Sequence, residues 1–80
     1  MATVVGFAGL THLGLVSSTA LAAQGFRVVC YDADAALVDR LRAGHLPVLE
    51  PGLDDMVSAN GETQVFTTAA ADLGACGVVY

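Results

Sequence analysis

The chain carries very little positive charge. Its 80 residues include no lysine, and Arg27, Arg40 and Arg42 stand against eight Asp and Glu, so the formal net charge is −5. A surface that binds nucleic acid needs a stripe of Lys and Arg to neutralise the phosphates. The sequence therefore argues against a nucleic-acid partner.

Long apolar runs and a basic leader are also missing. A membrane-spanning helix needs about 18 apolar residues in a row, and the longest apolar stretches are broken by the polar run 17–19 and by Gln24. No Lys or Arg precedes Arg27, whereas a secretory signal starts with a basic segment. We therefore predict a cytoplasmic protein without a membrane partner.

Two cysteines are too few for a disulfide framework. Cys30 lies inside an apolar run and Cys76 just before another, which favours buried apolar side chains over a disulfide or a catalytic thiol. Neither has a second Cys or a His at ligand spacing, so we predict no metal site.

Apolar residues make up 55% of the chain and charged residues 14%. Parallel strands covered by helices on both faces have this composition, whereas a small soluble domain usually carries more charge. Eighty residues are also about half of an ordinary domain. We expect residues 1–80 to be an incomplete domain of a larger protein.

Apolar β-branched segments alternate with helical ones along the chain. The pattern predicts strands at 3–9, 26–32, 64–68 and 76–80, helices at 12–24, 33–43 and 53–60, and a weak helical turn at 69–75. Such alternation is typical of an α/β fold with a parallel sheet and right-handed crossovers. A Rossmann-like, doubly wound sheet of about four strands would have the order 3-2-1-4.

A glycine-containing turn follows the first predicted strand and opens the first helix. It spans Gly9-Leu10-Thr11-His12-Leu13-Gly14, the six positions of a G-x-G-x-x-G dinucleotide-binding pattern, with Thr11 in place of the middle glycine. Amides at a helix start lack intrahelical acceptors and attract anions. We predict that these six residues bind the pyrophosphate of a dinucleotide. The alternative is a strand–turn–helix without a ligand, in which the glycines serve only packing.

Two residues of this loop have alternative interpretations. Thr11 either crowds the pyrophosphate with its Cβ or donates a hydrogen bond from its hydroxyl to a phosphate oxygen, and we favour the second. His12, in the first helical turn, is favoured as a solvated surface side chain, with a phosphate contact as the alternative.

Asp32 closes the second predicted strand, 18 residues after Gly14 and 23 after Gly9. An acid about 20 residues after the glycine loop accepts hydrogen bonds from the adenosine ribose in dinucleotide-binding folds. The same carboxylate would repel a 2′-phosphate, so the predicted cofactor is NAD. Asp34 needs no ligand, since it stands where a helix N-cap is expected.

The chain resembles the N-terminus of the UDP-glucose/GDP-mannose dehydrogenase family over 4–80. The resemblance lies in "GLTHLGLVSSTALAAQGFRVVCYDAD" and, more specifically, in the segment Pro47-Val48-Leu49-Glu50-Pro51-Gly52-Leu53. It implies the NAD-binding part of an enzyme that oxidises the C6 alcohol of a sugar nucleotide to the acid with two NAD, through a thioester on a cysteine. By this resemblance Leu37 replaces a Lys or Arg that helps to hold the adenosine end.

The resemblance also implies what this chain lacks. The cysteine nucleophile, its partners and the UDP-sugar site would lie beyond position 80, so we predict no catalytic residue here, and a homo-oligomer is left open. Glu50 is given no ligand role. The alternatives are a Rossmann-like module without cofactor and another NAD-dependent dehydrogenase, against which the Glu50–Leu53 segment speaks. An incomplete fourth strand would leave an open sheet edge, so we expect the free chain to be marginally stable or to self-associate.

Overall fold

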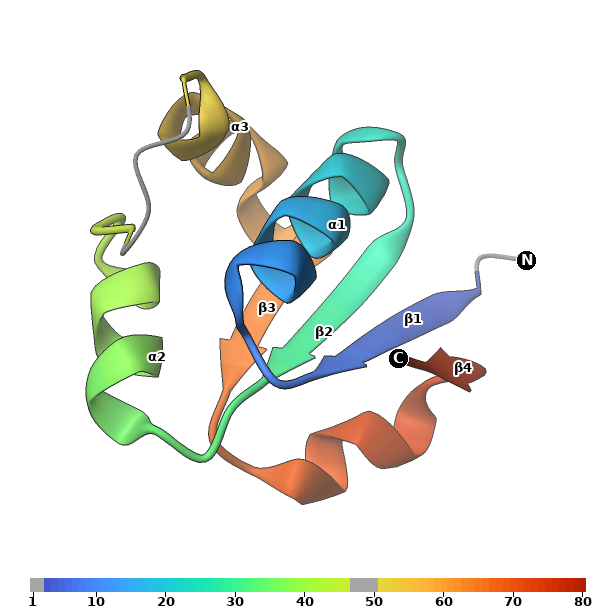
Figure 1. The fold of residues 1–80 in the computed structure, drawn as a ribbon. Coiled ribbons are helices and arrows are strands. Elements are labelled where there is room, and N and C mark those ends of the chain that lie inside the picture. Colours follow the sequence, from blue (N-terminus) through green and yellow to red (C-terminus); the bar gives the residue numbers. More distant parts are fainter. Residues whose placement is uncertain (1–2, 47–50) are drawn as a thin grey trace.

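The computed structural model describes residues 3–46 and 51–80 and contains a four-stranded parallel sheet with helices packed on it (Figure 1). The elements are β1 (Val4–Ala8), α1 (His12–Ala23), β2 (Arg27–Tyr31), α2 (Ala35–Arg42), α3 (Leu53–Asn60), η1 (Gly61–Thr63), β3 (Gln64–Thr67), η2 (Ala70–Ala75) and β4 (Val78–Val79).

The strand order is β3-β2-β1-β4, and all three pairings are parallel. This confirms the α/β class and the order predicted from the alternation of strands and helices. Because all strands point the same way, their carboxyl ends meet at one edge of the sheet. The residues that follow β1 and β2 lie side by side at the centre of that edge, since Ala8 pairs with Tyr31.

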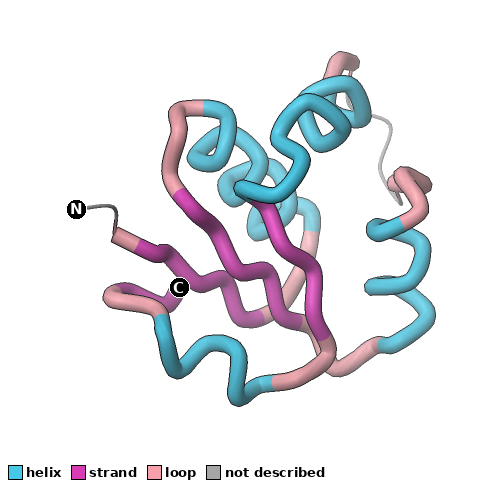
Figure 2. The backbone as a smooth tube through the Cα atoms, turned by 180° about the vertical axis from the view of Figure 1, so that it is seen from behind, coloured by secondary structure: helices cyan, strands magenta, loops and turns pink. Residues whose placement is uncertain are grey.

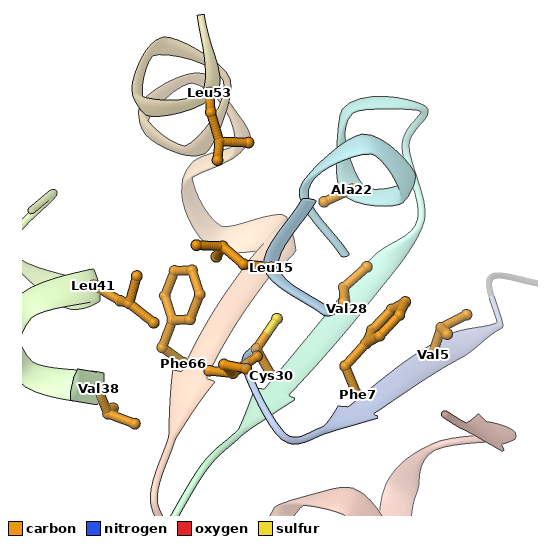
Figure 3. Packing of buried hydrophobic residues seen from close by; sticks show 11 residues of the cluster. Val5, Phe7, Leu15, Ala22, Val28, Cys30, Val38, Leu41, Leu53 and Phe66 are labelled. Carbon is orange, nitrogen blue, oxygen red and sulfur yellow. The ribbon is translucent and has the colours of Figure 1, made fainter. Parts of the chain in front are cut away.

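The hydrophobic core lies between the sheet and the α1 face (Figure 3). Side chains of a strand alternate between its two faces, so Val5 and Phe7 of β1 and Val28 and Cys30 of β2 point to the same side, towards α1. The core cluster of buried side chains contains Val5, Phe7, Leu10, Leu15, Ala22, Val28, Cys30, Val38, Leu41, Leu53 and Phe66.

The opposite face of the sheet carries η2, which the view from behind shows crossing below the strands (Figure 2). This segment packs closely because β1 has a glycine at its midpoint. A Cβ on Gly6 would lie 2.9 Å from Leu73 Cδ2 and 3.0 Å from Cys76 Sγ. Helical segments therefore lie on both faces, as a doubly wound sheet requires.

A buried polar group joins α1 to β3 and α3. The Gln64 amide nitrogen donates to Thr19 Oγ1 at 3.0 Å and to Ser18 Oγ at 3.3 Å, and Gln64 Oε1 accepts from Asn60 Nδ2 at 2.9 Å. Asn60 Nδ2 also reaches the Thr19 carbonyl at 3.1 Å. A buried amide is stabilising only when its hydrogen bonds are satisfied, and here they fix how α1 sits over the sheet.

Predicted and observed boundaries differ by at most two residues, and those of α3 coincide. The fourth strand is the shortest, with two residues in place of the predicted five, although Tyr80 still exchanges backbone hydrogen bonds with Gly6 and Ala8 of β1. Pro51 precedes Gly52, the N-cap residue of α3. Residues 47–50, including Glu50, lie outside the described residues.

Candidate cofactor site

The loop after β1 turns sharply at Gly9. This residue has φ +98°, a backbone conformation that L-residues with a Cβ rarely adopt. Its N–H donates to the Tyr31 carbonyl at 2.9 Å, so the turn is fixed on the end of β2. The first glycine of the pattern is therefore required by the backbone itself.

The third glycine of the pattern is required for space. A Cβ on Gly14 would lie 2.5 Å from the Gly9 carbonyl oxygen, closer than real Cβ contacts come. Only a residue without a side chain lets the first turn of α1 pack on the strand end that precedes it. The two glycines that the sequence retains thus have separate physical reasons.

The middle position imposes no such demand on the fold. Thr11 is the N-cap of α1 with φ −68° and ψ 176°, an extended conformation open to any residue. Its carbonyl accepts the first α-helical hydrogen bond, from Leu15 N–H at 2.9 Å, but its hydroxyl makes no capping bond. The exposed Thr11 side chain is thus compatible with the predicted contact to a phosphate oxygen, which stays a prediction.

Asp32 points at the loop. Its Oδ2 accepts a hydrogen bond from Leu10 N–H at 2.9 Å, and its Oδ1 accepts one from Asp34 N–H at 2.9 Å. The N–H donors, that of Leu10 first, hold the pKa of the Asp32 carboxyl below its ordinary value of 3.8, although partial burial opposes the shift. The group is thus a carboxylate at neutral pH and adjoins the start of the glycine loop.

Four backbone amides of the loop fall into two groups. Those of Gly9 and Leu10 donate to the end of β2, to the Tyr31 carbonyl and the Asp32 carboxylate. Those of Leu13 and Gly14 come before the Leu15 amide, which makes the first α-helical bond of α1. The amides suited to an anion are therefore those at the helix start, where the dipole adds partial positive charge.

The side chains of the loop point in different directions. Leu10 is 4% exposed and belongs to the core, whereas Leu13 is 75% exposed. His12 is exposed in the first turn of α1. The buried Leu10 side chain thus anchors the loop to the core, so Leu10 would affect ligand binding only by holding the loop in place.

The predicted adenosine side of the site is formed by the start of α2. Asp34 is the N-cap, as expected, with its Oδ1 accepting from Leu37 N–H at 3.1 Å. Leu37 packs partly buried against the core. The described residues on this side therefore offer a carboxylate from Asp32 but no cation at position 37.

A cavity of about 520 Å³ opens beside the loop, between α1 and the ends of β1 and β4. Sequence reasoning did not include Tyr80, whose ring stacks on Phe7 with centroids 5.4 Å apart. The predicted strand order could have indicated Tyr80, because a fourth strand beside the first ends at the same sheet edge as the glycine loop. The cavity is lined by Phe7, Ala8, Gly9, Thr11, Leu13, Gly14, Ser17, Ala20, Leu21, Gln24 and Tyr80.

Both cysteines are free thiols. Cys30 is fully buried in the core, as predicted, while Cys76 is half-buried against β1. Burial raises the pKa of the Cys30 thiol, so it is protonated at neutral pH. Within residues 3–46 and 51–80, no three His, Cys, Asp or Glu side chains gather as metal ligands do, and no helix is long and apolar enough to cross a membrane.

Comparison with known proteins gives a consistent result. Residues 3–80 match the sequence pattern of the UDP-glucose/GDP-mannose dehydrogenase family, NAD binding domain. The chain is 42% identical over 52 residues to UDP-glucose 6-dehydrogenase of Rhizobium meliloti, which covers 65% of this chain and 12% of that protein. It is 31% identical over 75 residues to UDP-glucose 6-dehydrogenase YwqF of Bacillus subtilis, covering 90% of this chain and 17% of that one.

Solved structures agree with these sequence matches. A UDP-glucose dehydrogenase from the hyperthermophilic archaeon Pyrobaculum islandicum superposes with a TM-score of 0.90 at 29% identity, over 99% of this chain and 19% of that one. The Rossmann-type fold, the family and its cofactor NAD are as the sequence predicted. The chain spans less than a fifth of the length of each of these three relatives.

Proposed function

The chain belongs to the UDP-glucose/GDP-mannose dehydrogenase family, and we propose that residues 9–14 and Asp32 bind NAD within a nucleotide-sugar 6-dehydrogenase. The proposal is carried by the direction of the Asp32 carboxylate. Its 2.9 Å hydrogen bond to Leu10 N–H brings a ribose acceptor to the loop that would hold the phosphates.

The pyrophosphate would lie over the start of α1. Leu13 and Gly14 supply amides that precede the first α-helical bond. Thr11 lines the same cavity as these two residues, and its hydroxyl would donate to a phosphate oxygen. Gly9 and Leu10 would contribute by holding the loop in place, since their amides are engaged at the end of β2. His12 is kept as a second, optional phosphate contact in the first turn.

The adenosine ribose would lie at the end of β2. A carboxylate accepts hydrogen bonds from both ribose hydroxyls, whereas a phosphate on the 2′ oxygen would meet it charge against charge. Position 37 is a leucine, so no Lys or Arg there offsets the repulsion. NAD should therefore be preferred over NADP.

The bound NAD would accept hydride from a sugar nucleotide such as a UDP-sugar, whose C6 alcohol is oxidised to the acid in two steps with two NAD. We assign no catalytic residue to positions 1–80. In this proposal the chain is the cofactor-binding part of the enzyme, and the groups that bind the sugar and attack it belong to other parts of the full-length protein. A cytoplasmic location and a homo-oligomeric state stay predictions.

Titration calorimetry of the 80-residue chain with NAD and with NADP tests the cofactor assignment. We expect saturable NAD binding with a Kd below about 1 mM, and NADP binding at least about tenfold weaker, which corresponds to about 1.4 kcal/mol. Equal binding of both would refute the role of Asp32. No saturation by NAD would favour a Rossmann-like module that has lost its ligand.

A further inference from the structure

We propose that Asp32 is also a positioning residue, which holds the glycine loop in its binding conformation before any ligand arrives. Each of its two carboxylate oxygens accepts one backbone N–H at 2.9 Å, Oδ2 from Leu10 and Oδ1 from Asp34. One side chain thus joins the loop after β1 to the turn after β2. The part of this inference that concerns ligand affinity rests on the proposed function.

The loop needs such an acceptor because of how it leaves β1. Gly9 turns the chain at φ +98°, and Leu10 then directs its side chain into the core. Its amide is left at the carboxyl edge of the sheet, beyond the last pair of β1 and β2, Ala8 with Tyr31. Without the Asp32 oxygen this half-buried N–H would lose its hydrogen bond, which is costly in a protein interior.

The geometry leaves room for a ligand on the same carboxylate. Two oxygens provide about four lone-pair positions, and the two backbone donors occupy one position on each oxygen. Two remain, the number that a ribose diol needs. Holding the loop and binding the ribose therefore draw on one group without competing, and loss of Asp32 should damage both.

The effect of removing Asp32 on phosphate affinity separates this proposal from simple charge repulsion, because the two predict opposite changes. Removing a carboxylate beside bound phosphates should strengthen their binding, because like charges repel. If Asp32 holds the loop, its removal weakens phosphate binding instead, even for a ligand that has no ribose hydroxyls. Asp34 is the matched control, since it has the same charge two residues away and its side chain caps α2 through Leu37 N–H.

The first experiment uses the ligand-free, ¹⁵N-labelled 80-residue chain and measures amide hydrogen exchange. In Asp32→Asn, exchange at the Leu10 amide should rise on the order of tenfold or more relative to the amides of β2, because asparagine offers one uncharged oxygen in place of the two ionised acceptors of Asp32. Asp34→Asn should leave Leu10 unchanged. A Leu10 rate that rises no more than the β2 amides would overturn the proposal.

A pH titration of the unmodified chain gives a second readout that needs no variant. The amide resonances of Leu10 and Asp34 should shift together, with one midpoint below the ordinary Asp value of 3.8, because both N–H groups bind the same low-pKa carboxylate. If the Leu10 resonance does not titrate, or titrates with a midpoint at or above 3.8, the acceptor role of Asp32 is refuted.

The ligand test uses 2′,3′-dideoxy-ADP, which keeps the diphosphate and lacks the ribose diol. Asp32→Asn should bind it several-fold more weakly than the unmodified chain, and Asp34→Asn as tightly or more tightly. Equal or tighter binding by Asp32→Asn would refute the effect of Asp32 on phosphate binding and leave it a role at the ribose alone. Should the unmodified chain bind neither NAD nor this analogue, the proposed function fails, while the exchange measurement still decides whether Asp32 holds the loop.

Discussion

Replacing Gly14 with alanine tests whether the close approach of α1 to the loop matters. In an ordinary helix this change would stabilise the protein by about 1 kcal/mol, since alanine is the better helix former. Here the new Cβ would lie 2.5 Å from the Gly9 carbonyl oxygen, whereas ordinary contacts begin at 3.4 Å. The helix start and the loop must therefore separate by about 0.9 Å, the difference between 3.4 and 2.5 Å.

Forced separations of this kind in packed regions cost about 1–3 kcal/mol. Set against the helix gain, Gly14→Ala should lower the free energy of unfolding by up to about 2 kcal/mol. Gly74→Ala is the matched control, because a Cβ there meets nothing within 4 Å and the residue has no positive φ. The control should be neutral or stabilising by up to about 1 kcal/mol.

Urea unfolding measures the first effect and calorimetric titration with NAD the second. A site whose amides are displaced by nearly an ångström loses its preorganisation, so NAD affinity should fall about tenfold or more in Gly14→Ala and stay unchanged in Gly74→Ala. If both variants unfold at the same urea concentration and bind NAD equally well, the close-approach explanation of Gly14 is wrong.

Three further predictions follow from the contacts. The fold lowers the pKa of Asp32 below its unfolded-state value of 3.8, so the ionised side chain stabilises the protein fully above pH 3.8, and this stabilisation is lost as the pH falls through the folded-state pKa. In Asp32→Asn the urea midpoint should therefore fall less steeply with acid than in the unmodified chain. An unchanged decline would contradict this. Gln64→Leu should lower the free energy of unfolding by about 1–3 kcal/mol in the same assay, because it removes the hydrogen bonds by which Gln64 joins β3 to α1 and to Asn60. Sedimentation should show self-association, and Val79→Lys, at a 48%-exposed position on the β4 edge, should reduce it. A monomer with a sharp reversible melt would refute this prediction.

The alternation of apolar strands with helices was enough to predict the sheet. Each strand is short and β-branched, and each helix ends near a glycine, so local preferences and the crossover rule agree on one topology. The end of β2 was equally accessible, because the residue that closes a strand beside β1 must lie near the loop after β1. Asp32 stands at this strand end and also has the spacing of about 20 residues after the glycine loop on which its assignment rests.

The partners of Asp32 were not accessible from sequence. Its hydrogen bond to Leu10 joins residues 22 positions apart, and it depends on the φ of Gly9 and on Leu10 entering the core. Tyr80 is a different case, because the predicted strand order places the end of the fourth strand at this edge but does not give its side-chain contact. Its stacking on Phe7 follows from the register of β4 against β1, which no local pattern near position 80 encodes.

The departure of this chain from the three-glycine pattern affects the ligand and not the fold. Gly9 is demanded by a positive φ and Gly14 by a carbonyl 2.5 Å from any Cβ, and both demands exist without a cofactor. The middle position has φ −68°, which threonine adopts freely. Only a phosphate close to the backbone could favour glycine there. Thr11 therefore carries no weight against the Rossmann-type fold, and its effect must be measured in the affinity for a diphosphate, where its hydroxyl and its Cβ act in opposite directions.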